Sequence, residues 1–207
     1  IGLNIDAEEA DRLELSLDLL ERLCFEPTLA GWQGIGFVVQ AYQKRCPAVI
    51  DFIVDLARRS GHRLMVRLVK GAYWDSEIKR AQLDGMDGYP VYTRKAYTDL
   101  AYIACARRLL AALDAVYPQF ATHNAHTLAA VVRMAKNAGV RIEHQRLHGM
   151  GEALYDSVVA PGANTIGDLG VTNLESVESI TPTYLWRHRP HGQFQPPHVD
   201  EASRVDA

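Results

Sequence analysis

Five residues near the middle of the chain combine charge, backbone freedom and flat aromatic surface. Two cations, Arg67 and Lys70, are three residues apart, and Gly71 follows them, where a residue without a side chain lets the backbone approach a ligand. Tyr73 and Trp74 then provide two rings on which a ligand can stack. Cations beside exposed backbone donors suit an anion, a phosphate, or an electron-rich ring whose reduced form is negative.

Each candidate also has a structural interpretation, which the residue types leave open. The two cations have carboxylate partners nearby in Asp75 and Glu77. Gln40 closes an apolar stretch, where its amide needs a partner and either binds the edge of a heteroaromatic ring or contacts a neighbouring loop. Asp6 is either a carboxylate of a functional site or the cap of a helix over 8–23, and capping is the preferred interpretation.

A second polar cluster comprises Thr122, His123 and Asn124, which together can orient a phosphate or a ring carbonyl. His123 and His126 also resemble a metal-ligand pair, which leaves open a metal-dependent barrel lyase or hydrolase. No carboxylate is suitably placed within the segment, so a metal would need ligands brought in by folding: His144, His148 or Asp6. We therefore predict no metal, and ordinary structural roles for His126 and His144.

The elements that must position these residues alternate between short apolar and longer amphipathic stretches. Strands are expected over 2–6, 34–40, 63–70, 119–123 and 141–148. Helices are expected over 8–23, 47–60, 93–113, 127–137 and 152–159, with a long loop between 71 and 92. About five βα units predict an α/β fold, a parallel sheet covered by helices. Polar residues recur at the strand ends, as in a (β/α)8 TIM barrel, although a flavodoxin-like sheet remains an alternative.

Five units fall short of the eight that a barrel needs, so the predicted sheet is open or part of something larger. We expect residues 1–159 to form a partial barrel and residues 160–207 an irregular carboxyl-terminal tail, because the periodicity fails beyond Pro161. The chain lacks an initiator Met, so this start is expected not to be the natural one. Unpaired strand edges would favour self-association.

Composition excludes several classes of protein. The 207 residues are 48% hydrophobic and 23% charged, which is typical of a globular domain. A net charge of -3 gives no reason to expect nucleic acid or an anionic membrane as partner. No apolar run reaches the roughly 18 residues of a membrane span, and no secretion signal is recognisable. The three scattered cysteines favour a reducing cytoplasm.

Several long strings resemble the proline dehydrogenase domain of bacterial proline utilization A enzymes, and the resemblance covers roughly residues 4–159. The strings are NIDAEEADRLELSLDLLE (4–21), GIGFVVQAYQKRCP (34–47), RLVKGAYWDSEIKRAQ (67–82), YPVYTRKAYTDL (89–100), FATHNAHTLAA (120–130) and LHGMGE (147–152). The length of these strings and their order along the chain make the probability of a chance match very small. The resemblance implies a distorted (β/α)8 barrel with noncovalent FAD. It also implies oxidation of L-proline to Δ1-pyrroline-5-carboxylate by hydride transfer to flavin N5, with electrons passed to quinone.

The resemblance also assigns roles to individual residues. Asp6, Arg67 and Tyr73 match catalytic positions, with Asp6 near the substrate amine and Arg67 near flavin N5. Asp6, Leu68, Tyr73 and Leu147 match positions that bind proline. Flavin contacts are implied for eleven residues: Gln40, Arg67, Val69, Lys70, Gly71, Ala72, Trp74, Thr93, Lys95, Thr122 and His123. The implied parent enzyme is cytoplasmic and touches the membrane only peripherally.

The sequence departs from the family after Val159. There the family continues through a last strand and a helix with paired arginines that bind the substrate carboxylate, whereas here Pro161 leads almost directly to the stretch beyond that helix. An earlier lysine, which also holds the carboxylate, has no counterpart. Each lost charge-assisted hydrogen bond costs about 1.5–3 kcal/mol of binding. We therefore predict weak or no proline turnover by this chain alone, and a catalytically inactive barrel fragment stays an alternative.

Overall fold

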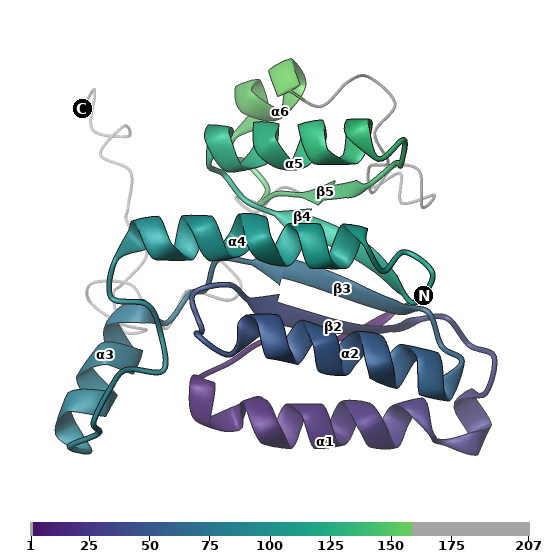
Figure 1. Ribbon diagram of the computed structural model, residues 1–207, viewed down its shortest axis with the longest axis horizontal. Coiled ribbons are helices and arrows are strands. Elements are labelled where there is room, and N and C mark those ends of the chain that lie inside the picture. The colour runs from purple at the N-terminus through teal and green to yellow at the C-terminus, as the bar shows by residue number, and fades with distance from the viewer. Residues whose placement is uncertain (1, 159–207) are drawn as a thin grey trace, which may run out of the picture. The chain divides into compact units, whose positions relative to one another are not determined.

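The computed structural model describes residues 2–158, and these contain a parallel sheet with helices along one side (Figure 1). The strands are β1 (Leu3–Ile5), β2 (Ile35–Gln40), β3 (Leu64–Val69), β4 (Val116–Ala121) and β5 (Glu143–Gln145). They pair in the order β1-β2-β3-β4-β5, and every pairing is parallel. The α/β sheet expected from the sequence is confirmed, and the predicted tail over 160–207 lies outside the described residues.

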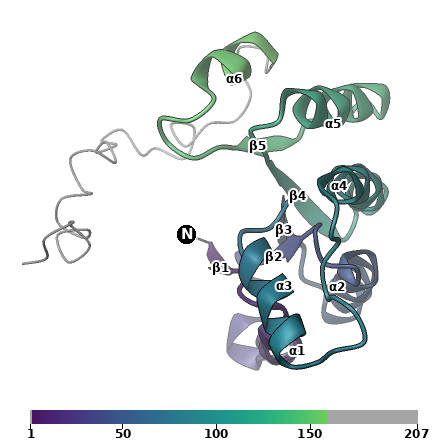
Figure 2. The same cartoon turned by 90° about the vertical axis from the view of Figure 1, so that its left-hand side faces the viewer.

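Helices follow these strands in turn. They are α1 (Leu13–Cys24), α2 (Cys46–Ser60), α3 (Trp74–Leu83), α4 (Lys95–Leu110), α5 (Ala125–Asn137) and α6 (Glu152–Val158), with 3-10 turns η1 (Ala10–Arg12) and η2 (Pro27–Leu29). Figure 2 shows α1, α2, α4 and α5 on the same side of the sheet. Because βα connections in parallel sheets have one hand, consecutive helices fall on one face of a sheet whose strands are in sequence order, as in a barrel wall.

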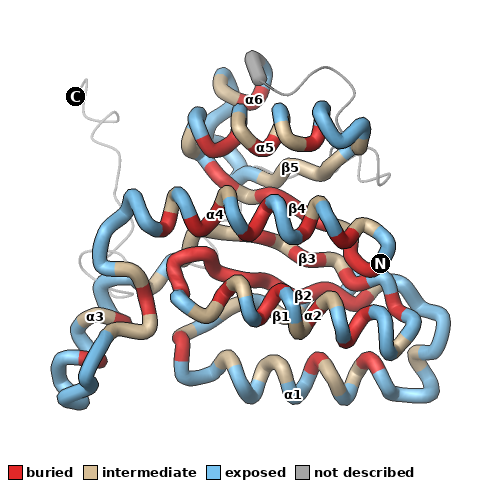
Figure 3. Tube along the Cα trace, viewed as in Figure 1, coloured by how far each residue is buried: buried red, intermediate tan, exposed pale blue. Residues whose placement is uncertain are grey.

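The hydrophobic core lies between the sheet and these helices. On β3, Leu64, Val66 and Leu68 are fully buried towards the helices, while the alternate residues Met65 and Arg67 face the other way and are only partly buried. The same alternation places apolar residues of β2 and β4 in the core, and Figure 3 shows the resulting buried layer. Burying each such side chain stabilises the fold by about 1.5–3 kcal/mol. The face of the sheet towards the helices is thus occupied by the hydrophobic core, and the opposite face is available for polar residues.

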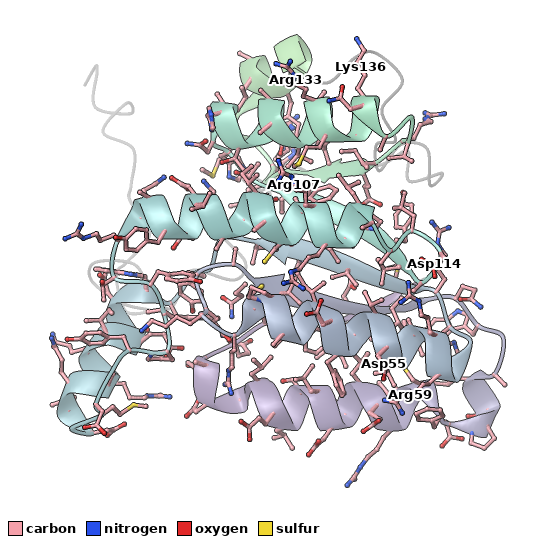
Figure 4. All side chains as sticks on the ribbon, in the orientation of Figure 1. Asp55, Arg59, Arg107, Asp114, Arg133 and Lys136 are labelled. Carbon is pink, nitrogen blue, oxygen red and sulfur yellow. The ribbon has the colours of Figure 1, made fainter. Side chains whose placement is uncertain are left out.

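The outer surfaces of the helices carry solvent-exposed ion pairs. Asp55 and Arg59 lie one turn apart on α2 (Figure 4), with Nε of Arg59 2.7 Å from Oδ2 of Asp55. Arg58 reaches Asp114 at 3.0 Å. All four side chains are more than 40% exposed, so each pair contributes no more than about 1 kcal/mol to stability. The described helices include none that is long and apolar enough to cross a membrane.

Several sequence-based assignments are wrong. The first α-helix begins at Leu13 instead of 8, and β5 covers Glu143–Gln145 instead of 141–148. Helix α3 lies inside the stretch expected to be a loop, because its polar surface has no apolar stripe: within it only Glu77 and Ala81 are buried. The fourth strand is Val116–Ala121 instead of 119–123, and Pro118 lies inside it, although proline is disfavoured between two strands. His123 consequently follows the strand and belongs to a loop.

Candidate active site at the carboxyl ends of the strands

An ion pair joins the loop after β1 to β3. Nη2 of Arg67 donates to Oδ1 of Asp6 at 2.7 Å, across 61 residues of sequence. Arg67 is 28% exposed, while Asp6 is 67% exposed and also accepts the backbone N–H of Ala7. The caps of the next helical segments are Glu9 and Arg12, so the interpretation of Asp6 as a helix cap is wrong. Asp6 instead lies with Arg67 at the carboxyl end of the sheet.

The same loop supplies a second carboxylate, Glu8. The phenol of Tyr73 donates to Oε2 of Glu8 at 2.7 Å, and this hydrogen bond raises the pKa of Tyr73, so the phenol stays protonated. The amide of Gln40 donates to the backbone carbonyl of Glu8 at 2.8 Å. Of the two interpretations of Gln40, the contact with a neighbouring loop is therefore the observed one in this structure. Tyr73 and Arg67 thus both bind the loop between β1 and η1, here called the acidic loop because it carries Asp6, Glu8 and Glu9.

A cationic cluster follows β3. Lys70 and Lys95 both donate to the carboxylate of Asp99, with Nζ of Lys95 2.6 Å from Oδ2. Partial burial would raise the pKa of Asp99, but the hydrogen bonds from the two lysines outweigh it and lower that pKa. Two ammonium groups share one carboxylate, so the cluster keeps a net positive charge. The exposed Thr93 lies two residues before Lys95, the first residue of α4.

The backbone between these groups follows an unusual path at Gly71. Its φ is +130°, and a Cβ added there would lie 2.4 Å from the ring of Tyr42. Trp74 is 43% exposed and donates its indole N–H to the carbonyl of Tyr92 at 2.8 Å. Val69 and Ala72 flank the turn, the first partly buried and the second exposed. This turn presents backbone and an aromatic face beside the lysines.

The loops after β4 and β5 meet at His123. Its Nε2 accepts the backbone N–H of Leu147 at 3.1 Å. The hydroxyl of Tyr155 bridges the two loops, since it lies 2.6 Å from the carbonyl oxygen of Thr122 and 2.7 Å from that of Gln145. Leu147 is 63% exposed, and Thr122 is buried. These two loops therefore also lie at the carboxyl end of the sheet, where their own contacts through His123 and Tyr155 hold them together.

One predicted residue lies apart. Leu68 is fully buried in the core on the helix side of the sheet, where its carbonyl accepts a hydrogen bond from Tyr102. Its predicted contact with proline stays a prediction. Three polar residues that contact the site were not singled out from the sequence as site residues: Glu8, Asp99 and Gln119. Only Gln119 carried a sequence signal, a polar side chain inside an apolar strand.

A polar row crosses the sheet face away from the helices. The register pairs Arg67 with Gln119 and Gln119 with Glu143. The amide of Gln119 donates to Glu143 at 3.1 Å, but its Oε1 is buried without a hydrogen-bond partner in the structure. Nε of Arg67 is likewise buried without a partner. A buried donor and a buried acceptor without partners destabilise the fold, and a polar ligand that pairs with them would remove that cost.

A metal centre receives no support from the described residues. Within 2–158 no three His, Cys, Asp or Glu side chains are grouped so that they could hold a metal ion. His126 is exposed at the start of α5, while His144 lies on β5 with its ring edge-on to Tyr155 at 6.4 Å. Burial lowers the pKa of His144.

Comparisons with known proteins agree on one family. The family model described as proline dehydrogenase matches residues 1–189. Among curated proteins, the bifunctional protein PutA of Klebsiella aerogenes is 69% identical over 166 residues, which is 79% of this chain and 13% of the relative. That of Rhizobium meliloti is 67% identical over 165 residues, again 13% of the relative. The chain thus spans about an eighth of the length of these relatives.

Solved structures give the same result. Proline utilization A of Bradyrhizobium japonicum, a D779W mutant, is 60% identical with a TM-score of 0.72, over 75% of this chain and 16% of that one. Proline utilization A of Bdellovibrio bacteriovorus, described as inactivated by N-propargylglycine, is 35% identical with a TM-score of 0.73, over 76% of this chain and 17% of that one. The sheet and helices of this chain therefore have the arrangement found in these larger proteins.

Proposed function

Since this chain belongs to the proline dehydrogenase family, we propose that it supplies the flavin-binding part of a site that oxidises L-proline to Δ1-pyrroline-5-carboxylate. The reaction is part of proline catabolism in a larger enzyme, and residues 1–159 are its partial barrel. The observation that carries the proposal is Arg67, a cation on the open sheet face with one nitrogen on Asp6 and a second buried without a partner. Such a group is poised for an additional polar ligand.

The described residues fit FAD as the cofactor. Bound flavin would accept the hydride from proline at N5. Arg67 would supply positive charge to the negative reduced ring, and Lys70 with Lys95 would supply the net positive charge that a pyrophosphate requires. Trp74 offers an exposed aromatic face, and Gly71 exposes backbone. The remaining proposed flavin contacts are Gln40, Val69, Ala72, Thr93, Thr122 and His123.

For the substrate, we assign Asp6 to the secondary amine of proline, since a carboxylate that is 67% exposed can accept the N–H of an approaching cation. Tyr73 and Leu147 would enclose the ring. The resemblance also assigns Leu68 to it, but that side chain is buried on the helix side of the sheet. Tyr73 remains protonated because it donates to Glu8, so it contributes a neutral surface and not a base. Asp6 and Arg67 hold each other in orientation before substrate arrives.

Quinone is the proposed electron acceptor, reached by peripheral contact of the parent enzyme with the membrane, and the proposed location is the cytoplasm. No nucleic-acid partner is proposed for this segment. Self-association is proposed for the isolated chain, because β1 and β5 are the two outer strands of the described sheet and expose backbone donors and acceptors.

The test is an absorbance spectrum of the purified chain after incubation with FAD and desalting, followed by anaerobic L-proline. We expect retained flavin bands, with weak or no bleaching, because the paired arginines that bind the substrate carboxylate in the family have no counterpart after Val159. An R67A variant should lose flavin, whereas D75A, a change of an exposed carboxylate in α3, should retain it. A colourless wild-type protein would overturn the proposal. Stoichiometric zinc in place of flavin would instead support the metal-dependent alternative.

A further inference from the structure

Glu77 is a buried carboxylate to which no role has been assigned. It lies in the first turn of α3 and is 3% exposed. Its Oε1 accepts the backbone N–H of Ala10 at 2.6 Å, across 67 residues of sequence. A buried carboxylate is costly unless it is hydrogen-bonded, so a position that retains one needs a specific partner. Here the partner is the backbone of the acidic loop.

Ala10 is the point at which that loop becomes helical. It begins η1, whose N-cap residue, Glu9, provides no side-chain hydrogen bond. The first N–H groups of a helical segment lack partners within the segment, and capping side chains normally satisfy them. Glu77 provides this hydrogen bond from a different element. The carbonyl of Ala10 accepts a hydrogen bond from the guanidinium of Arg45, so both backbone polar groups of Ala10 are held from outside the loop.

The loop between β1 and η1 is therefore fixed at three points. Ile5 ends β1, the amide of Gln40 holds the carbonyl of Glu8, and Glu77 holds Ala10. Between these points the loop projects Asp6 towards Arg67. Without the last hydrogen bond, Arg45 would be the one side chain still holding Ala10 in the described structure.

Glu77 is also hydrogen-bonded to Tyr73, which binds the same loop through Glu8. Its backbone N–H donates to the carbonyl of Tyr73 at 2.9 Å, within the same first turn of α3. Tyr73 in turn donates its phenol to Glu8. One helical turn thus holds the loop through two hydrogen bonds, one to the side chain of Glu8 and one to the backbone of Ala10. The position of α3 and the position of Asp6 are coupled through Glu77.

We propose that Glu77 is a positioning residue that holds the 6–10 loop against α3 and so keeps Asp6 opposite Arg67. The proposal rests on the proposed function for the roles of Asp6 and Arg67. Glu77 itself touches neither of them: it acts through Ala10. A second contact between the same elements, Arg80 to Asp11 at 2.7 Å, is about half exposed on both sides and is a weaker restraint.

The experiment compares E77A, E77Q and the matched control D75A in the full chain. Asp75 is a carboxylate in the same turn of α3, but it is exposed. Amide hydrogen exchange is followed in peptides covering 6–12, with peptides covering 125–137 of α5 as an internal reference for unfolding elsewhere. We expect exchange over 6–12 to accelerate about 10-fold to 100-fold in E77A, while the reference stays unchanged. E77Q keeps an acceptor oxygen and should stay within about threefold of wild type, as should D75A.

Three results would overturn the proposal: equal exchange over 6–12 in E77A and D75A, equal acceleration of 6–12 and 125–137 in E77A, or E77Q behaving as E77A. The first means no restraint, the second a general loss of stability, and the third a need for charge and not for an acceptor.

A second measurement separates this proposal from the proposed function. Where the wild-type chain binds FAD and proline bleaches it, E77A should raise the half-saturating proline concentration about tenfold, with FAD affinity within threefold of wild type. An unchanged proline dependence would contradict the role of Glu77 in positioning Asp6. Where the wild-type chain fails to bind FAD, the proposed function fails. In that case, and also where FAD binds but proline does not bleach it, hydrogen exchange alone decides whether Glu77 holds the loop.

Discussion

The ring of Tyr42 occupies the space in which a side chain at Gly71 would lie. A Cβ at Gly71 would be 2.4 Å from Cδ1 of Tyr42, and φ at Gly71 is +130°. Tyr42 is 1% exposed and held by backbone hydrogen bonds to Lys70 and Tyr92, so it cannot move aside. G71A should therefore lower the free energy of unfolding by about 3 kcal/mol or more, measured by urea denaturation.

Gly85 provides the control for that variant. It also has a positive φ, +62°, but beyond its two chain neighbours no atom lies within 4 Å of a Cβ built there. G85A should cost only the conformational term, about 1 kcal/mol. Equal losses for G71A and G85A would show that the contact with Tyr42 adds nothing.

The Arg67–Asp6 pair should matter for chemistry more than for stability. Asp6 is 67% exposed, so breaking the pair in D6A should change the free energy of unfolding by less than about 1 kcal/mol. In the FAD-loaded protein, D6A should slow any proline-dependent bleaching by roughly 100-fold, because the amine loses its carboxylate. Anaerobic stopped-flow absorbance measures the rate. D11A, which removes an exposed carboxylate paired with Arg80, should leave that rate unchanged.

His144 should make stability depend on pH near neutrality. Burial lowers the pKa of His144 below its ordinary value of 6.5, so the unfolded chain binds more protons than the folded chain between these two values. Stability is then complete above about pH 6.5 and declines as the pH falls towards the lowered pKa. H144Q should flatten this part of a urea-midpoint profile, whereas H126Q, a change of an exposed histidine, should not. A profile of H144Q that parallels wild type would contradict the assignment.

Asn124 should contribute to stability as the cap of α5. Its Oδ1 accepts the backbone N–H and the hydroxyl of Thr127, both at 2.9 Å. N124A should lower the free energy of unfolding by about 1 kcal/mol, and N124D should retain most of it. Thermal or urea unfolding distinguishes them, and N137A at the other end of α5 serves as the control. The cap is dispensable if N124A unfolds like N137A.

The sheet could be predicted from the sequence because burial follows a repeating pattern. Leu64, Val66 and Leu68 alternate with residues of the other face, and such alternation is the signal that periodicity detects. Helix α3 lacks any comparable stripe. Of its two buried residues, Ala81 and Glu77, only Glu77 is polar, and its carboxylate accepts a hydrogen bond from Ala10. No local pattern contains such a contact across 67 residues.

The site was predicted only in part for the same reason. Arg67, Lys70 and Tyr73 are neighbours in sequence, so their clustering was visible directly. The partners that orient them are Asp6, Asp99 and Glu8, which come from other elements. Asp6 was preferred as a cap because capping is a local interaction that sequence spacing can suggest, whereas its ion pair requires β1 and β3 to be placed on either side of β2.

The strict strand order has a consequence for synthesis on the ribosome. Within the described sheet, each strand pairs with its predecessor and its successor in sequence, so every ladder can close as soon as the next βα unit has emerged. The Asp6–Arg67 pair can form when β3 has left the exit tunnel, and the contact of His123 with Leu147 forms after it. The carboxyl end of the sheet, which carries the candidate site, can thus be assembled in the order of translation, one strand at a time.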